Sequence, residues 1–149
     1  MRAGSKQAQK GMSLIEVLVA LLILTVGILG AAAVQVNALK YTDSSRMTSQ
    51  ASFIAYDMMD RIRANAAADY TVTPPTSGNL SVARDQDLYD FTTNIVNFGG
   101  PTATGTITVN QRVYTITINW NDSRAANATG TTRSFVLSSR ATVDPVATP

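Results

Sequence analysis

The chain has 149 residues and a formal net charge of +2. It contains no cysteine and no histidine, which excludes disulfides, thiol nucleophiles, histidine acid–base catalysis and most transition-metal sites. Three of its twelve basic residues lie in the first eleven positions, and ten acidic residues outnumber the other nine. The sequence has no basic patch of the kind that binds nucleic acid, and it has no glycine-rich phosphate loop. We therefore expect no nucleic-acid partner, no cofactor and no small-molecule substrate.

A short basic leader precedes an apolar segment. Residues 1–11 carry Arg2, Lys6 and Lys10 and no acid, and no charged residue occurs from Val17 to Leu39. A helix needs about 20 apolar residues to cross the hydrocarbon core of a bilayer. Basic residues before such a helix hold that end in the cytoplasm. The pattern predicts a single-pass segment, with the chain after it on the far side of the membrane.

Three processing routes fit this N-terminus. A secretory signal would end at the small-residue site Ala31-Ala32-Ala33 and release a β-rich domain. A plain anchor would stay uncleaved. A leader cut at Gly11, before the apolar segment, would leave the whole helix in the mature protein. Composition alone leaves all three routes open.

The residues at the leader boundary resemble a known signal. The stretch from Gly11 to Leu22, GMSLIEVLVALL, resembles the class III signal of type IV prepilins and type II secretion pseudopilins. In that family a membrane prepilin peptidase cleaves after the glycine and N-methylates the new first residue. The resemblance therefore implies a leader of residues 1–11, cleavage after Gly11 and methylation of Met12. Methionine stands here where the family usually has phenylalanine.

Glu16 is the acid at the start of the apolar segment and the fifth residue after the expected cut. Cleavage would create an α-amino cation on Met12 in or beside lipid, where an unpaired charge costs at least about 2.5 kcal/mol. Glu16 lies one helical turn away and can offset that cost in its own chain or on a neighbouring subunit. The resemblance implies the second arrangement, in which Glu16 sets axial register during assembly. The alternative is an acid that simply rests at the membrane interface.

Helical patterning continues beyond the apolar segment. Neither proline nor glycine occurs between Gly30 and Pro74, and Asp57 and Arg61 stand four residues apart on a polar face. The opposite face carries apolar residues at helical spacing, namely Met47, Ala51, Ile54, Ala55, Met58 and Ile62. The sequence predicts one helix with a membrane and assembly half over 12–40 and an amphipathic half over 41–65.

The segment 66–105 is predicted to be a linker and irregular region. Pro74-Pro75 ends the helix, and Gly99-Gly100-Pro101 breaks the chain again. Between these breaks, the stretch Leu80–Phe98 leaves a short helix or a loop open.

Residues 106–143 are predicted to form antiparallel strands. Threonines alternate with apolar and aromatic residues, a pattern typical of half-buried strands. We expect a hairpin turn at Asn110–Arg112 and a third strand from Arg133 to Val143. The predicted fold class is α+β, with a long N-terminal helix packed on a small antiparallel β-sheet within a head of residues 41–149. This is also the plan that the resemblance to type IV pilins implies.

Two clusters contain residue types that occur in binding sites. Asp85, Asp87 and Asp90 can supply oxygen ligands to calcium, but the glycine and glutamate of an EF-hand loop are missing, which favours a solvated loop. Tyr114 and Trp120 can form a platform for a carbohydrate, but aromatic residues at a period of two favour core positions. The sequence predicts no metal site and no enzymatic activity.

Two later stretches resemble the PilV family of minor type IV pilins. They are residues 41–65, which end in AYDMMDRIRAN, and the predicted strand YTITINWND from Tyr114 to Asp122. The resemblance implies a minor pilin that joins other minor pilins and the major pilin through its N-terminal helix. It would initiate pilus assembly in the bacterial inner membrane, with a periplasmic head, and stay at or near the pilus tip. The competing assignments are a minor pseudopilin of a type II secretion system and a secreted periplasmic β-domain protein.

Overall fold

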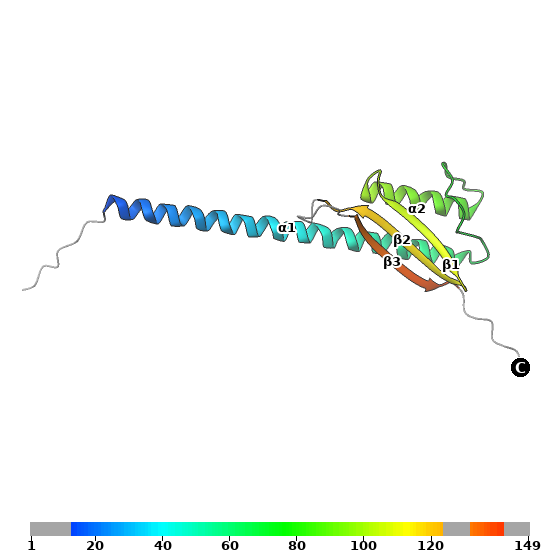
Figure 1. The fold of residues 1–149 in the computed structure, drawn as a ribbon. Helices are drawn as coiled ribbons and strands as arrows, with labels where there is room; N and C mark the ends of the chain where they lie inside the picture. Colours follow the sequence, from blue (N-terminus) through cyan, green and yellow to red (C-terminus); the bar gives the residue numbers. More distant parts are fainter. Residues whose placement is uncertain (1–12, 124–131, 142–149) are drawn as a thin grey trace, which may run out of the picture. The chain divides into compact units, whose positions relative to one another are not determined.

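The structure, a computed structural model, describes residues 13–123 and 132–141 (Figure 1). Its elements in chain order are α1 (Leu14–Ala64), α2 (Ala83–Gly99), β1 (Thr104–Asn110), β2 (Val113–Asn121) and β3 (Thr132–Arg140). A long, N-terminally apolar helix is thus followed by a small three-stranded antiparallel sheet, which confirms the predicted α+β class. The chain divides into two compact units between Leu39 and Lys40, and each unit is described by itself.

The second half of α1 supplies one wall of the core in the second unit. Its buried residues repeat at helical spacing and are Ala51, Ala55, Met58, Met59 and Ile62. Four of these lie on the face predicted from the sequence, and the predicted Met47 and Ile54 are partly buried against the same core. Full burial of a side chain such as Ile62 contributes about 1.5–3 kcal/mol. Tertiary packing therefore holds this half of the helix in place.

The sheet supplies the opposite wall. Its strands are ordered β1-β2-β3, and both neighbouring pairs are antiparallel. The central strand β2 buries alternate residues, namely Tyr114, Ile116, Ile118 and Trp120. Trp120 also meets Phe98 of α2 edge-to-face, with ring centroids 5.4 Å apart. Tyr114 and Trp120 are therefore core residues, as their spacing favoured, and they form no exposed platform.

Residues 83–99 form α2, within the segment predicted to be irregular. The helix buries one stripe, Leu88, Phe91 and Ile95. It ends where Gly100 adopts a positive φ of 83° and donates its N–H to the carbonyl of Val96 at 2.9 Å. The first turns of α2 are polar, so the spacing of apolar residues in the sequence does not distinguish a helix from a loop. The contacts of the apolar stripe with the core favour the helix.

A glycine in β1 lets α2 approach the sheet. A Cβ atom at Gly105 would lie 2.7 Å from Cε1 of Phe91 and would also collide with Ile95. These distances are shorter than ordinary van der Waals contact, so any larger residue would push α2 away from the sheet. Sequence analysis did not recognise this role for Gly105.

The third strand ends at Arg140, three residues before the end predicted from the sequence. Phe135, Leu137 and Ala141 are partly buried against the core, as predicted. Val143, the fourth residue assigned to that face, lies outside the described residues.

The turn between β1 and β2 contains two residues. Asn110 pairs with Val113, so only Gln111 and Arg112 connect the strands, within the predicted turn. Their φ angles are 48° and 66°. Two consecutive positive φ values identify a type I′ turn, which strongly favours asparagine and glycine. Gln111 therefore adopts a conformation that glutamine seldom takes.

Gln111→Asn is expected to stabilise the head by about 0.5–1 kcal/mol, because asparagine tolerates the left-handed region better than glutamine. Urea unfolding of the full chain in detergent, followed by the fluorescence of the one tryptophan, Trp120, measures the change. Gln111→Val is the matched control and should destabilise, since a β-branched residue resists positive φ. Equal stability of the two variants would contradict the turn assignment.

Candidate membrane and assembly segment

A serine caps the start of α1. The backbone N–H of Glu16 donates to Oγ of Ser13 at 3.3 Å and to the Ser13 carbonyl at 3.0 Å. Serine followed three residues later by glutamate is the spacing of a capping box. The carboxylate of Glu16 also lies in the first turn, where the helix dipole favours negative charge. Sequence analysis missed Ser13, although this spacing before an apolar run was the signal.

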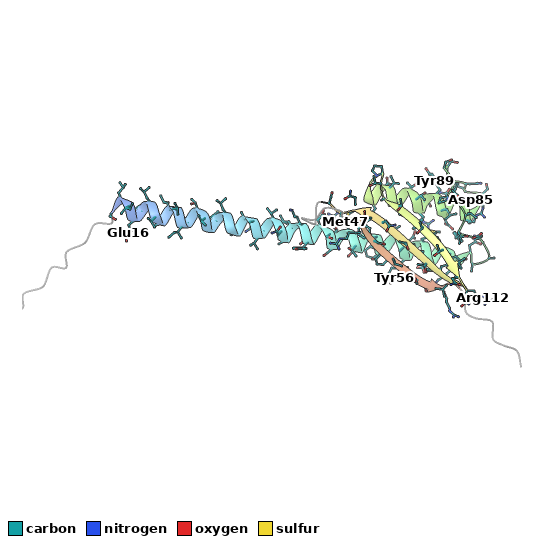
Figure 2. The ribbon with its side chains drawn as sticks, in the orientation of Figure 1. Glu16, Met47, Tyr56, Asp85, Tyr89 and Arg112 are labelled. Atoms are coloured by element: carbon teal, nitrogen blue, oxygen red, sulfur yellow. The ribbon has the colours of Figure 1, made fainter. Side chains whose placement is uncertain are left out.

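Glu16 is exposed at the N-terminal end of α1 (Figure 2). Gly11 and Met12, the expected cleavage and methylation residues, lie outside the described residues. The pairing of Glu16 with the α-amino group of Met12 therefore stays a prediction. The geometry adds a local role for Glu16, because the same side chain stabilises the first turn of its own helix.

The first unit presents an apolar surface on all sides of its helix. Every residue from Leu14 to Leu39 is exposed, and Leu14 and Leu29 are 80% and 70% exposed. By length and composition this helix is long and apolar enough to cross a membrane. So large an exposed apolar surface is unfavourable in water. It requires lipid or other apolar helices around it.

The N-terminus matches the family described as "Prokaryotic N-terminal methylation motif" over residues 6–32. The matched range contains the basic Lys6 and Lys10, the expected cleavage residue Gly11 and the acid Glu16. This N-terminal segment is similar to that of type IV pilins and pseudopilins. The match supports a pilin or a pseudopilin and implies processing by prepilin peptidase and assembly with other pilins. No curated protein and no solved structure matches the chain significantly.

The match covers residues 6–11 of the predicted leader, the first turn of α1 and part of its apolar segment. It agrees with a membrane-anchored protein that enters a pilus, since the matched helix has the composition of a membrane span. The motif ends before the second unit begins, so it does not extend to the head.

In the second unit, Arg61 of α1 binds two acidic residues of α2. Its Nη1 atom lies 2.9 Å from Oδ1 of Asp87 and 3.2 Å from Oδ2 of Asp90, and its Nε donates to Asp57 at 2.9 Å. The hydroxyl of Tyr70 donates to the second oxygen of Asp87 at 2.7 Å. We call these five residues the Arg61 junction. Its charge-assisted hydrogen bonds tie the end of α1 and the following link to α2.

The junction changes the proton affinities of two of its members. Burial alone would lower the pKa of Arg61, but hydrogen bonds and charges from Asp87 and Asp57 raise it above its ordinary value. Burial raises the pKa of the Tyr70 hydroxyl to about 12, and the bond to Asp87 acts in the same direction. Tyr70 therefore stays a hydrogen-bond donor well above neutral pH.

The acidic cluster does not lie in a loop, so the predicted solvated loop is wrong. Asp85, Asp87 and Asp90 all belong to α2. Arg61 engages Asp87 and Asp90, whereas Asp85 lies 2.7 Å from Nη2 of Arg84. In residues 13–123 and 132–141, no group of three acidic, histidine or cysteine side chains is placed to hold a metal ion. The spacing that suggested calcium instead turns two carboxylates toward one guanidinium.

Asp122, directly after β2, carries a buried carboxylate. Its residue is 4% exposed, and its Oδ2 accepts a hydrogen bond of 2.6 Å from Ser44 of α1. Nε of Arg133 lies 3.7 Å from the same oxygen. A buried charge is stable only when it is paired and hydrogen-bonded, and here Ser44 lies far away in the sequence whereas Arg133 follows eleven residues later. Asp122 thus joins the end of β2 to the start of the amphipathic half of α1.

Through Tyr70, the head is expected to lose about 2 kcal/mol of stability as the pH rises from 10 to 12. The pKa of Tyr70 is raised in the folded chain, so its contribution is complete below about pH 10 and disappears as the pH passes 12. Urea unfolding of the full chain in detergent between pH 8 and 12 measures this slope. Tyr70→Phe should flatten that part of the profile, and an unchanged slope in this variant would contradict the assignment.

Proposed function

We propose that this protein is a minor type IV pilin that helps to initiate pilus assembly and stays at or near the pilus tip. The observation that carries the proposal is the methylation motif over residues 6–32, joined to a helix whose surface is apolar on every side. A plain anchor needs no such motif. A released periplasmic domain would lose the half of the helix that the motif marks.

The proposed maturation removes residues 1–11. Prepilin peptidase cleaves after Gly11 and N-methylates Met12, which leaves α1 intact in the mature chain. Residues 12–40 then form the membrane and assembly half of the helix, and residues 41–149 form the periplasmic head. The basic leader faces the cytoplasm, because positive charge before an apolar helix resists translocation.

Glu16 is proposed to neutralise the methylated α-amino group of a neighbouring subunit. In lipid an unpaired cation costs at least about 2.5 kcal/mol, so a staggered helix that brings a carboxylate beside it is favoured over other registers. Glu16 is exposed at the start of α1 and available to such a neighbour. The partners are other minor pilins and the major pilin, reached through the N-terminal helix within the inner membrane.

The assignment to minor pilins rests on the resemblance of residues 41–65 and of Tyr114–Asp122 to the PilV family. Both stretches build the head, since the first carries Arg61 and the second is β2 with Asp122. The absence of cysteine agrees with this assignment, because many major pilins staple the end of the head with a disulfide.

Location tests the proposal. Deletion of the gene in its own host should reduce surface pili, and a tagged copy should restore them and occur in the sheared pilus fraction at a low ratio to the major pilin. A tagged copy that purifies with the type II secretion machinery, with piliation unchanged by the deletion, would overturn the proposal in favour of a minor pseudopilin.

A further inference from the structure

The part of α1 over residues 41–50 has less support than the helix on either side of it. It follows Lys40, the first charged residue after the apolar segment, and none of its ten residues is buried. Before it, apolar surroundings of residues 14–39 would offer the backbone no water to bind, which favours the helix. After it, Ala51 and Ala55 begin the face that is buried in the core. Within it, Met47 is partly buried against that core.

The composition of residues 41–50 also disfavours a helix. Six of the ten residues are serine, threonine or aspartate, which have lower helix propensity than alanine because their side chains bind nearby backbone groups. In and directly after this stretch, four hydroxyls donate to carbonyls three or four residues earlier at 2.6–3.1 Å, namely those of Ser45, Thr48, Ser49 and Ser52. Such bonds slightly destabilise a helix and often bend it. Because an isolated helix of about ten residues is marginal in water, this stretch depends on tertiary contacts.

A tertiary hydrogen bond ties the stretch to the end of the sheet. Oγ of Ser44 donates to Oδ2 of Asp122 at 2.6 Å, and Asp122 is 4% exposed. A hydrogen bond to a charged acceptor is stronger than one between neutral groups. If the turn at Ser44 opened, the buried carboxylate would lose a donor, which is unfavourable. The bond therefore opposes opening of the helix where the local sequence favours it.

We propose that residues 41–50 form a hinge in α1, which opens locally while the helix on both sides stays folded, and that the bond from Ser44 to Asp122 keeps this hinge closed. Segments with few buried contacts open at lower free energy than the core. Loss of the contact at Asp122 releases the hinge, so the end of β2 controls whether α1 is one continuous helix or two. The inference does not depend on the proposed pilus function.

Amide hydrogen exchange of the full chain in lipid nanodiscs tests the hinge. In an α-helix each amide donates to the carbonyl four residues earlier, so residues 45–50 report on the bonds that open. After correction for intrinsic rates, these amides should exchange about 100-fold faster than those of residues 55–62, which lie in the part of α1 that packs on the core. Equal protection of the two ranges would overturn the proposal.

Two neighbouring serines give a matched test of the bond to Asp122. Ser44→Ala and Ser45→Ala raise helix propensity equally, but Ser44 donates to Asp122, whereas Ser45 donates to the carbonyl of Tyr41 at 3.0 Å. Ser44→Ala should accelerate exchange over residues 45–50 by about tenfold, since it leaves a buried carboxylate with one donor fewer. Ser45→Ala should slow the same exchange by about twofold.

The sign and the extent of these changes decide the proposal. It predicts opposite changes in the two variants, both confined to residues 45–50. Slower or unchanged exchange in Ser44→Ala would mean that the bond to Asp122 does not hold the hinge closed. Acceleration of residues 55–62 by the same factor as residues 45–50 would mean that the bond supports the head as a whole, and it would overturn the hinge.

Discussion

Replacing Glu16 with alanine should lower the amount of this protein in sheared pili by about 10- to 100-fold, a loss of roughly 1.4–2.8 kcal/mol. Under the proposed function, the variant leaves the methylated α-amino cation of a neighbouring subunit without its carboxylate in an apolar environment. Cleavage after Gly11 should continue, because the leader and the cut site are unchanged. Immunoblots of the pilus and membrane fractions, with N-terminal masses, measure both effects.

Two further variants separate charge from helix capping. Glu16→Gln keeps the capping-box side chain but removes the charge, so it should assemble as poorly as Glu16→Ala. Ser13→Ala removes the hydroxyl that accepts from the Glu16 N–H but keeps the charge, and it should assemble well. Normal incorporation of Glu16→Gln would mean that Glu16 acts only on its own helix.

Replacing Arg61 with methionine should destabilise the head by about 2–3 kcal/mol. The substitution leaves Asp87 and Asp90 close together without the cation that holds them, and the side chain of Asp87 is only 16% exposed. The variant also releases Asp57, the third carboxylate at the guanidinium. Urea unfolding of the full chain in detergent, followed by Trp120 fluorescence, gives the change in free energy of unfolding.

Arg63→Met is the matched control, on the same helix two residues later. Arg63 pairs with Asp60 at 2.9 Å on the exposed side and donates to Ser139, and exposed pairs contribute at most about 1 kcal/mol. Adding Asp87→Asn and Asp90→Asn to Arg61→Met should recover much of the lost stability, since the only released carboxylate would be that of Asp57, whose side chain is 57% exposed. Equal losses in Arg61→Met and Arg63→Met would contradict the role of the junction.

Periodicity in the sequence predicted the elements that repeat one pattern over many residues. Ala51, Ala55, Met58 and Ile62 share a face because they recur at helical spacing with no proline or glycine between them, and that face is buried. The alternation around Ile116 and Ile118 predicted β2 for the same reason. Such patterns indicate which face of a helix or strand is buried, even when the element that packs against it is not known.

Features that depend on distant partners escaped sequence analysis. The helix α2 has a polar start, and its conformation depends on Phe91 and Ile95 meeting a glycine in β1. Asp87 and Asp90 look like solvated acids until Arg61, more than twenty residues earlier, is placed beside them. Asp122 is buried because Ser44 hydrogen-bonds to it across most of the head sequence. No local spacing encodes these pairs.

The candidate site was more predictable than the head. Gly11, Met12 and Glu16 lie within one contiguous motif, so the match over residues 6–32 needs no tertiary structure. The serine cap at Ser13 was also readable from its spacing to Glu16. The contacts within the head, by contrast, depend on tertiary structure, because the fold alone brings Arg61 to Asp87 and Asp90.

The most direct test of the account is the intact mass and N-terminal sequence of the mature protein from membranes of its own host. The account predicts a chain that begins with N-methylated Met12 and retains the whole of α1. A chain that begins near Val34 would mean cleavage as an ordinary secretory signal, and it would contradict the assembly of this protein through its N-terminal helix.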